Sequence, residues 1–180
     1  MSYTITTPSA TEPITLEEVK AHLRVDGDLE DPSLAAYLSA ARSHCERFTG
    51  LSFVEQGITL VKRRKELVDD LQPFEPQKVY IDLPLSPVVA VDSVKDGDGN
   101  EVIHEVDIDS VPAVLTVDDM PAKLLVEYTT GTTQVLPDVK LAILMMTHLM
   151  YQHRGDIPKE AVERVEEAFL RTHRVALGVA

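Results

Sequence analysis

The chain has 180 residues, a length suited to one domain or to one domain with an appendage. Its hydrophobic content of 44% excludes a disordered chain, and no apolar run approaches the ~20 residues that a membrane span needs. The formal net charge of −13 argues against tight nucleic-acid binding, which usually requires a basic patch, although an acidic wall would let DNA slide past.

Residues 1–13 are expected to form an extended N-terminal arm, because Pro8 and Pro13 oppose a helix. The segment has no basic start and no apolar core, so we expect no signal peptide. We therefore expect a soluble cytoplasmic protein, or a protein that leaves the cell only inside a larger particle.

The stretch from Ile14 to Gly50 predicts a short helix, an acidic turn and a longer helix. Thr15 and Glu18 form a capping box at the start of the first helix. The second helix is predicted to begin with Asp31 as N-cap and Pro32 at the first helical position, and to end at Gly50. Its apolar stripe comprises Leu34, Leu38, Ala41, Cys45 and Phe48. Several alanines, including Ala36 and Ala40, would let another helix approach closely, or they are simple helix formers.

From about Phe53 the hydrophobic period changes to two, which predicts strands. The expected strands lie around Ile58 and Leu60 and at 79–83, 88–95, 102–107, 113–117 and 123–128. The segment 62–78 is expected to be a strand end and an exposed loop, whose basic run 62–65 alternatively contacts a phosphate or an acidic subunit. Asp96–Asn100 has the composition of a hairpin turn. It is not a calcium loop, because Glu101 stands where that loop needs glycine.

The segment 138–153, opened by Pro137, predicts a helix that is apolar nearly all round and therefore the centre of the core. Some of its surface is expected to be buried by a neighbouring subunit. A fourth helix is expected to run to about His173. The apolar tail 174–180 either attaches to a partner or tucks back onto its own domain.

The sequence contains no phosphate-binding glycine loop, no nucleophile elbow and no HExxH motif. Cys45 is the single cysteine and is expected to be a small core residue. We therefore predict no catalytic residue, no metal site and no cofactor, and we favour a structural protein over an enzyme.

The predicted fold class is α+β, with a mainly helical core of about four helices and a small antiparallel β portion inserted into it. The expected division is an arm at 1–13, a helical core at 14–52 and 132–173, a β insertion at 53–131 and a C-terminal tail at 174–180.

Several segments together resemble one protein family. They are ITLEEVKAHLRVDGDLEDPSLAAYLSAARSHCERFTG, LPLSPVVAVDSV, the strand end Tyr128–Gly131 and LPDVKLAILMMTHLMYQHRGD. They look like the head–tail connector (adaptor, or head-completion) proteins of long-tailed bacteriophages and gene transfer agents, and they occur in that family's usual order. The resemblance covers about Thr6 to Asp156.

The resemblance implies a virion protein at the head–tail interface, made in the host bacterial cytoplasm. It implies a homo-oligomeric ring of about twelve copies on the portal protein, with a tail-side stopper or terminator protein below. DNA would pass through the ring without sequence-specific binding, and no membrane would be involved. The C-terminal part of such proteins tends to engage the portal, which makes Arg174, Val175, Leu177 and Val179 candidate portal contacts.

Helix composition predicts the subunit interface at Ala36, Ala40, Met145 and Met146. A ring needs two different complementary faces on each subunit. The alternative function is a small cytoplasmic regulator that uses 16–23 and 31–49 as a DNA-binding helix-turn-helix. The acidic turn and the few basic residues on these helices speak against it.

Overall fold

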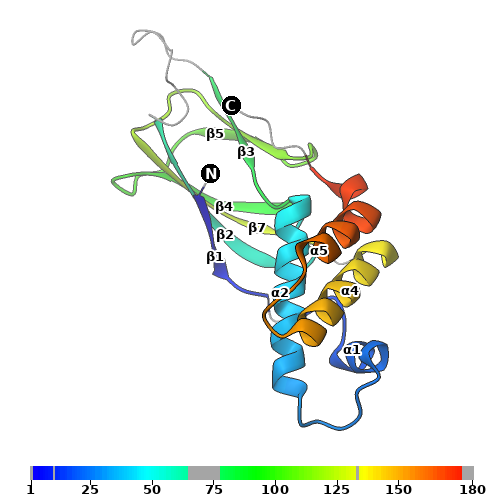
Figure 1. Ribbon diagram of the computed structural model, residues 1–180. Helices are drawn as coiled ribbons and strands as arrows, with labels where there is room; N and C mark the ends of the chain where they lie inside the picture. Colours follow the sequence, from blue (N-terminus) through cyan, green and yellow to red (C-terminus); the bar gives the residue numbers. More distant parts are fainter. Residues whose placement is uncertain (1, 10, 65–77, 133, 176–180) are drawn as a thin grey trace.

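The computed structural model describes residues 2–9, 11–64, 78–132 and 134–175. The helices gather at one end of the molecule and the strands at the other (Figure 1). The helices are α1 (Leu16–Leu23), α2 (Asp31–Thr49), α4 (Pro137–His153) and α5 (Lys159–Val165). Helix α5 continues as a π-helical turn η1 (Glu166–Leu170) and a 3-10 turn η2 (Arg171–His173).

The strands form two antiparallel sheets, with the orders β1-β2-β7-β4 and β3-β6-β5. Their bounds are β1 (Ser2–Thr7), β2 (Gln56–Arg63), β3 (Val79–Leu83), β4 (Val88–Asp96), β5 (His104–Asp107), β6 (Ala113–Val117) and β7 (Lys123–Thr130). Strands β2, β6 and β7 alternate between more and less buried residues, because successive side chains point to opposite faces.

The prediction of a mainly helical core with a small β portion is wrong. Seven strands in the described part of the chain build two sheets, and these have a hydrophobic core of their own. That core includes Ile58, Leu60, Ile81, Leu115, Leu124 and Tyr128, all at most 1% exposed. The helices enclose a second, separate core. The alternation of β-branched residues located the strands but gave no measure of how much surface they bury against one another.

Helix α1 begins as its sequence predicts. The Glu18 amide donates to Thr15 Oγ1 at 3.2 Å, and the Thr15 amide donates to Glu18 Oε2 at 2.7 Å. The hydrogen bond from the Thr15 backbone lowers the pKa of the Glu18 carboxyl. These two bonds confirm the capping box.

Helix α2 packs against α4, as its apolar stripe predicts. Leu34, Leu38, Ala41 and Cys45 are at most 3% exposed and share a core with Ile143 of α4. Burial raises the pKa of the Cys45 thiol to about 12, so the side chain stays a neutral core group.

The ends of α2 were predicted with mixed success. The N-cap is Glu30, which makes no side-chain capping bond, so the prediction of Asp31 as the N-cap is wrong. Pro32, predicted at the first helical position, is the second residue of the helix and lies in its first turn. Gly50 ends the helix with φ +74°, as predicted.

The segment expected as an extended arm contains an edge strand. Strand β1 pairs antiparallel with β2, so that Tyr3 lies opposite Leu60 and Ile5 opposite Ile58. The pairing joins residues more than fifty positions apart, and local sequence patterns carry no signal for such a contact.

A dense set of polar contacts lies where α2 leads into the sheets. Arg42 pairs with Glu12 at 2.7 Å and with Glu46 at 2.6 Å, and Glu46 also accepts the Phe53 amide at 2.8 Å. Burial raises the pKa of the Glu46 carboxyl, which is 3% exposed. This buried ion pair connects the helical core to the start of the sheet.

Gly131 makes the closest backbone approach at the same junction. Its φ is +137°, and a Cβ atom built on it would lie 2.4 Å from the carbonyl oxygen of Val54. Its amide donates to the carbonyl oxygen of Pro87 at 3.0 Å. The end of β7 therefore meets the loop before β2 with no room for a side chain.

The described residues of the basic run 62–65 differ in their exposure to solvent. Lys62 is 6% exposed within β2, whereas Arg64 is exposed and lies 3.7 Å from Asp119. The loop predicted within 62–78 falls largely on residues 65–77, which lie outside the described residues.

Candidate assembly surfaces

The exposed face of α2 carries small side chains. Ala36 and Ala40, predicted as interface residues, are both exposed. They belong to a stripe at three- and four-residue spacing, which we call the α2 stripe: Ser33, Ala36, Ala40, Ser43 and Arg47. Residues at this spacing share one helix face. The stripe faces away from the core residues of α2.

The two methionines predicted for the interface lie in different surroundings. Met146 is 1% exposed and belongs to the helical core of its own chain. Met145 is half-buried and lies on the outer side of α4 with Leu141, which is 39% exposed. Consecutive helical residues point about 100° apart, which explains the difference.

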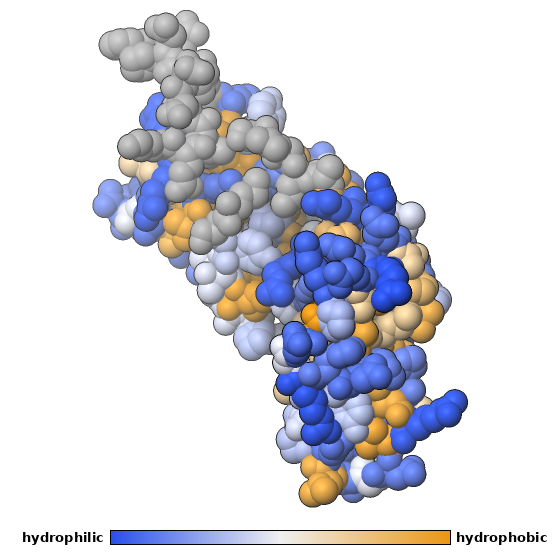
Figure 2. Space-filling model, viewed as in Figure 1, coloured by the Kyte–Doolittle hydropathy of each residue, from blue (hydrophilic) through white to orange (hydrophobic). Residues whose placement is uncertain are grey.

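Met145 lines an apolar groove of about 710 Å³, which we call the α4–α5 groove. Its lining residues come from α1, α4, α5 and η1: His22, Leu141, Met145, His148, Leu149, Ala161, Arg164, Val165, Ala168 and Phe169. Hydrophobic surface is exposed on the side of the helical unit where α4 lies (Figure 2). None of the lining residues is acidic.

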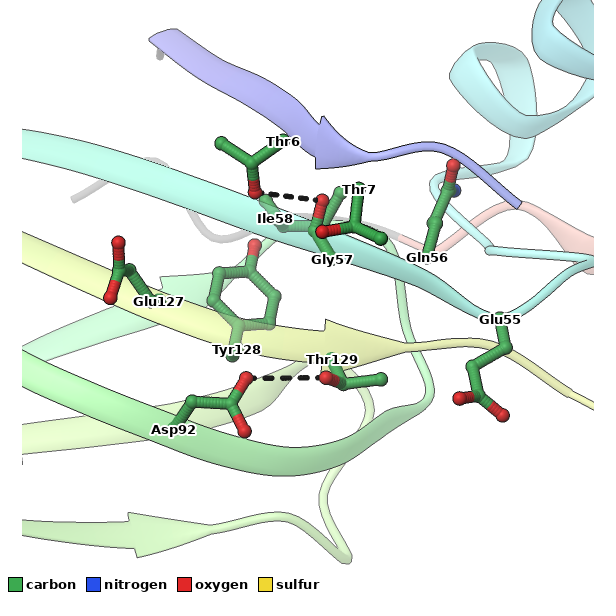
Figure 3. Close-up of a pocket in the computed structure, with 10 residues that line it drawn as sticks. All are labelled: Thr6, Thr7, Glu55, Gln56, Gly57, Ile58, Asp92, Glu127, Tyr128 and Thr129. Carbon is green, nitrogen blue, oxygen red and sulfur yellow. Dashed lines mark hydrogen bonds between the residues drawn. The ribbon is translucent and has the colours of Figure 1, made fainter. Parts of the chain in front are cut away.

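A polar crevice of about 390 Å³ lies on the four-stranded sheet (Figure 3). Thr129 donates its hydroxyl hydrogen to Asp92 Oδ2 at 3.2 Å, and Thr6 donates to the carbonyl oxygen of Gly57 at 3.2 Å. Glu127 accepts a hydrogen bond from Ser93 at 2.8 Å. The carboxylates of Asp92 and Glu127 thus each accept a hydrogen bond from a hydroxyl group. The crevice offers an acidic, hydroxyl-rich surface.

The crevice provides no metal centre. Among the residues that the structure describes, no group of three or more His, Cys, Asp or Glu side chains is placed to hold a metal ion. Within the same ranges, no helix combines the length and the apolar character needed to span a bilayer.

The C-terminal segment is tied back to the helical unit. His44 lies 2.7 Å from Glu166, and His173 lies 2.6 Å from Asp138. The hydrogen bond with His173 lowers the pKa of the Asp138 carboxyl. Helices α2 and α4 thereby hold the segment from Glu166 to His173.

The predicted portal contacts follow directly after this tied segment. Arg174 is exposed, and its guanidinium lies 5.6 Å from the Phe48 ring centroid. The Val175 amide donates to the carbonyl oxygen of Thr49 at 2.7 Å. Leu177 and Val179 lie outside the described residues. The first two residues after His173 therefore lie against the C-terminal end of α2.

Residues 12–163 match the family model described as head completion protein. The match covers most of the 180 residues. The chain belongs to the head completion protein family. This membership confirms the resemblance drawn from the sequence, and with it a structural head–tail connector role.

Solved structures of gene transfer agent (GTA) particles contain chains with the same fold as this head completion protein. A chain in the neck of an empty GTA particle, computed with C6 symmetry, gives a TM-score of 0.78 at 18% identity. A chain in the neck of a native GTA particle, computed with C12 symmetry, gives a TM-score of 0.65 at 17% sequence identity. A chain in the virion of a native GTA particle gives a TM-score of 0.64 at 18% sequence identity. Each match covers 100% of this chain and 98% of the other. A comparison with curated protein sequences gives no match.

The structure gives no support to the helix-turn-helix alternative. A recognition helix presents basic and amide side chains to the DNA. In this head completion protein the α2 stripe carries one basic residue, Arg47. The acidic turn between α1 and α2 holds Asp28, which pairs with Lys20 at 2.8 Å.

Proposed function

We propose that this head completion protein forms a closed ring of about twelve copies in the neck of a phage or GTA particle, between the portal protein and a tail-side stopper or terminator protein. The family match over residues 12–163 carries the proposal. The shared fold with chains of GTA neck structures computed with C6 and C12 symmetry supports the ring.

The charge of the chain supports passage of DNA through the ring. Each copy has a formal net charge of −13, so a ring of about twelve copies carries a large negative charge in total. Phosphates are repelled by such a wall, and a polyanion slides through it without adhering. The acidic, hydroxyl-rich crevice on the four-stranded sheet is a surface of this kind.

We further propose that the C-terminal segment faces the portal, with Arg174 and Val175 at the start of the contact. In the division proposed from the sequence, residues 174–180 are the tail that makes this contact, and 53–131 are inserted into the helical unit. Removing residues 174–180 is then expected to leave the ring intact and to abolish its binding to the portal. Normal binding of the truncated chain would contradict the assignment.

The test of the ring is to image purified particles and to count this protein in them by quantitative mass spectrometry. About twelve copies per particle are expected, in a ring at the head vertex. A protein that is present only as a free monomer and is absent from the particles would refute the proposal.

A further inference from the structure

The helical unit has two different surfaces on opposite sides of its core. On α2, the stripe lies roughly 150° around the helix from the core residues Leu34, Leu38, Ala41 and Cys45. On α4, Leu141, Met145 and His148 lie roughly 140° from the core residues Val139, Ala142, Ile143 and Met146. Because α2 and α4 pack through these core residues, the α2 stripe and the α4–α5 groove face away from each other.

The shapes of the two surfaces are complementary. The α2 stripe, from Ser33 to Arg47, is a ridge about 21 Å long, since a helix rises 1.5 Å per residue. Four of its five side chains are small, which permits a close approach of the helix backbone between Ser33 and Ser43. The α4–α5 groove is open, has an apolar floor, and has Ala161 and Ala168 along its α5–η1 wall. A helix with small side chains is the kind of element that fits between such walls.

Electrostatics identify the occupant as a second copy of this chain. The protein carries 30 acidic residues, so copies repel one another over most of their surface. The α2 stripe has no carboxylate, and neither do the ten residues that line the groove. Two acidic copies can therefore meet through these surfaces without placing carboxylates opposite each other, which would cost free energy at an interface.

We propose that the α2 stripe of one copy docks into the α4–α5 groove of the next copy, and that this repeated contact closes the ring. The inference rests on the proposed function. A contact between two different surfaces on opposite sides of a subunit is heterologous, and it forms a ring when the rotation between copies closes. Each copy then has one stripe and one groove engaged, and closure strengthens every individual contact.

Cysteine cross-linking tests the contact directly in assembled particles. The variant with both Ala40→Cys and Met145→Cys places one thiol on the stripe and one in the groove. A short bifunctional thiol cross-linker is expected to join these copies into a ladder that extends to the closed ring. The native Cys45 is 0% exposed and should not react, so the parent chain should give monomers only. The control variant pairs Met145→Cys with Ala90→Cys, an exposed position on β4, and should give no ladder.

The outcomes separate the inference from the proposed function. If imaging shows rings in the double variant but no ladder forms, the docking inference is overturned and the ring remains. If particles lack the protein, both are overturned. Cross-linked dimers from Ala40→Cys alone would show a symmetric stripe-to-stripe contact and would also overturn the inference.

A bulky residue on the stripe gives a second test. Ala40→Trp is expected to leave the circular dichroism and the melting temperature of the monomer unchanged, because Ala40 is exposed. It should weaken ring assembly by about tenfold or more, since overfilling a packed site is strongly unfavourable. Equal loss of folding and assembly would mean that Ala40 acts within its own chain, and assembly at the parent level would rule out the docking.

Discussion

Replacing Gly131 with alanine should be among the most damaging small changes to the fold. The new Cβ would lie 2.4 Å from the carbonyl oxygen of Val54 and 2.6 Å from the Cα of Glu55, whereas ordinary contacts are 3.4–4 Å. Both neighbours are backbone atoms, so no side chain can rotate to relieve the overlap. Overfilling costs about 1–3 kcal/mol, and a positive φ of +137° costs alanine a similar amount.

The expected total for Gly131→Ala is about 4 kcal/mol of the free energy of unfolding. For a chain of this length, that loss lowers the melting temperature by roughly 8–16 °C. Thermal unfolding followed by circular dichroism measures the shift. The free energy follows from urea titration of the same samples.

Gly99→Ala is the matched control. Gly99 also has a positive φ, +91°, but a Cβ there would meet nothing within 4 Å. Gly99→Ala should therefore lower the free energy of unfolding only by the cost of backbone strain, about 1–2 kcal/mol. If the two variants lose the same stability, the close approach at the junction does not constrain the fold, and the steric reasoning fails.

Three further changes test individual contacts. Thr15→Ala removes the cap of α1 and should lower the free energy of unfolding by about 1 kcal/mol, or the melting temperature by roughly 2–4 °C. Thr172→Ala, at an exposed position, is the control and should leave the melting temperature unchanged; equal shifts would contradict the capping argument. Tyr128→Phe deletes a hydroxyl that donates to a buried carbonyl oxygen at 2.9 Å, and urea titration should show a loss of about 1 kcal/mol; an unchanged midpoint would mean that the bond contributes nothing. Arg42→Met leaves the Glu46 carboxylate buried without its counter-ion, at a cost of about 3–5 kcal/mol at neutral pH. Burial raises the pKa of Glu46, so the folded state takes up a proton more readily than the unfolded state. Urea titrations from about pH 8 to about pH 5 should therefore show the stability loss of the variant shrinking as the pH falls. A loss that grows as the pH falls would contradict the raised pKa.

Local chemistry explains why the helices were predictable. The Thr15–Glu18 capping box, the proline near the start of α2 and Gly50 at its end all act within a few residues of the chain. The apolar stripe of α2 also identified its packing face correctly. The error at the N-cap of α2 arose because Asp31 is a good capping residue by type, yet Lys20 pairs with its carboxylate at 2.6 Å.

The architecture of the sheets was not predictable in the same way. The separate sheet core depends on pairings such as β3 with β6, which join distant segments. The number of strands was close to what alternation indicated, but the partner of each strand was not encoded locally. For the interface, composition pointed to Ala36, Ala40 and Met145, which are accessible. It also included Met146, which neighbouring helices bury.

The turn from Asp96 to Asn100 offers a practical handle on orientation. Asp96 accepts the amides of Asp98 and Asn100 at 2.9 Å each, so the turn closes on itself and Asp98 to Asn100 are exposed. Strand β4 begins beside the junction and carries this turn to the end of the sheets that lies away from the helices (Figure 1). A short peptide tag inserted after Asp98 would therefore mark the outer tip of the sheets without touching either core. In an averaged image of the neck, the radius of that extra density would distinguish sheets that line the channel from sheets that form the rim.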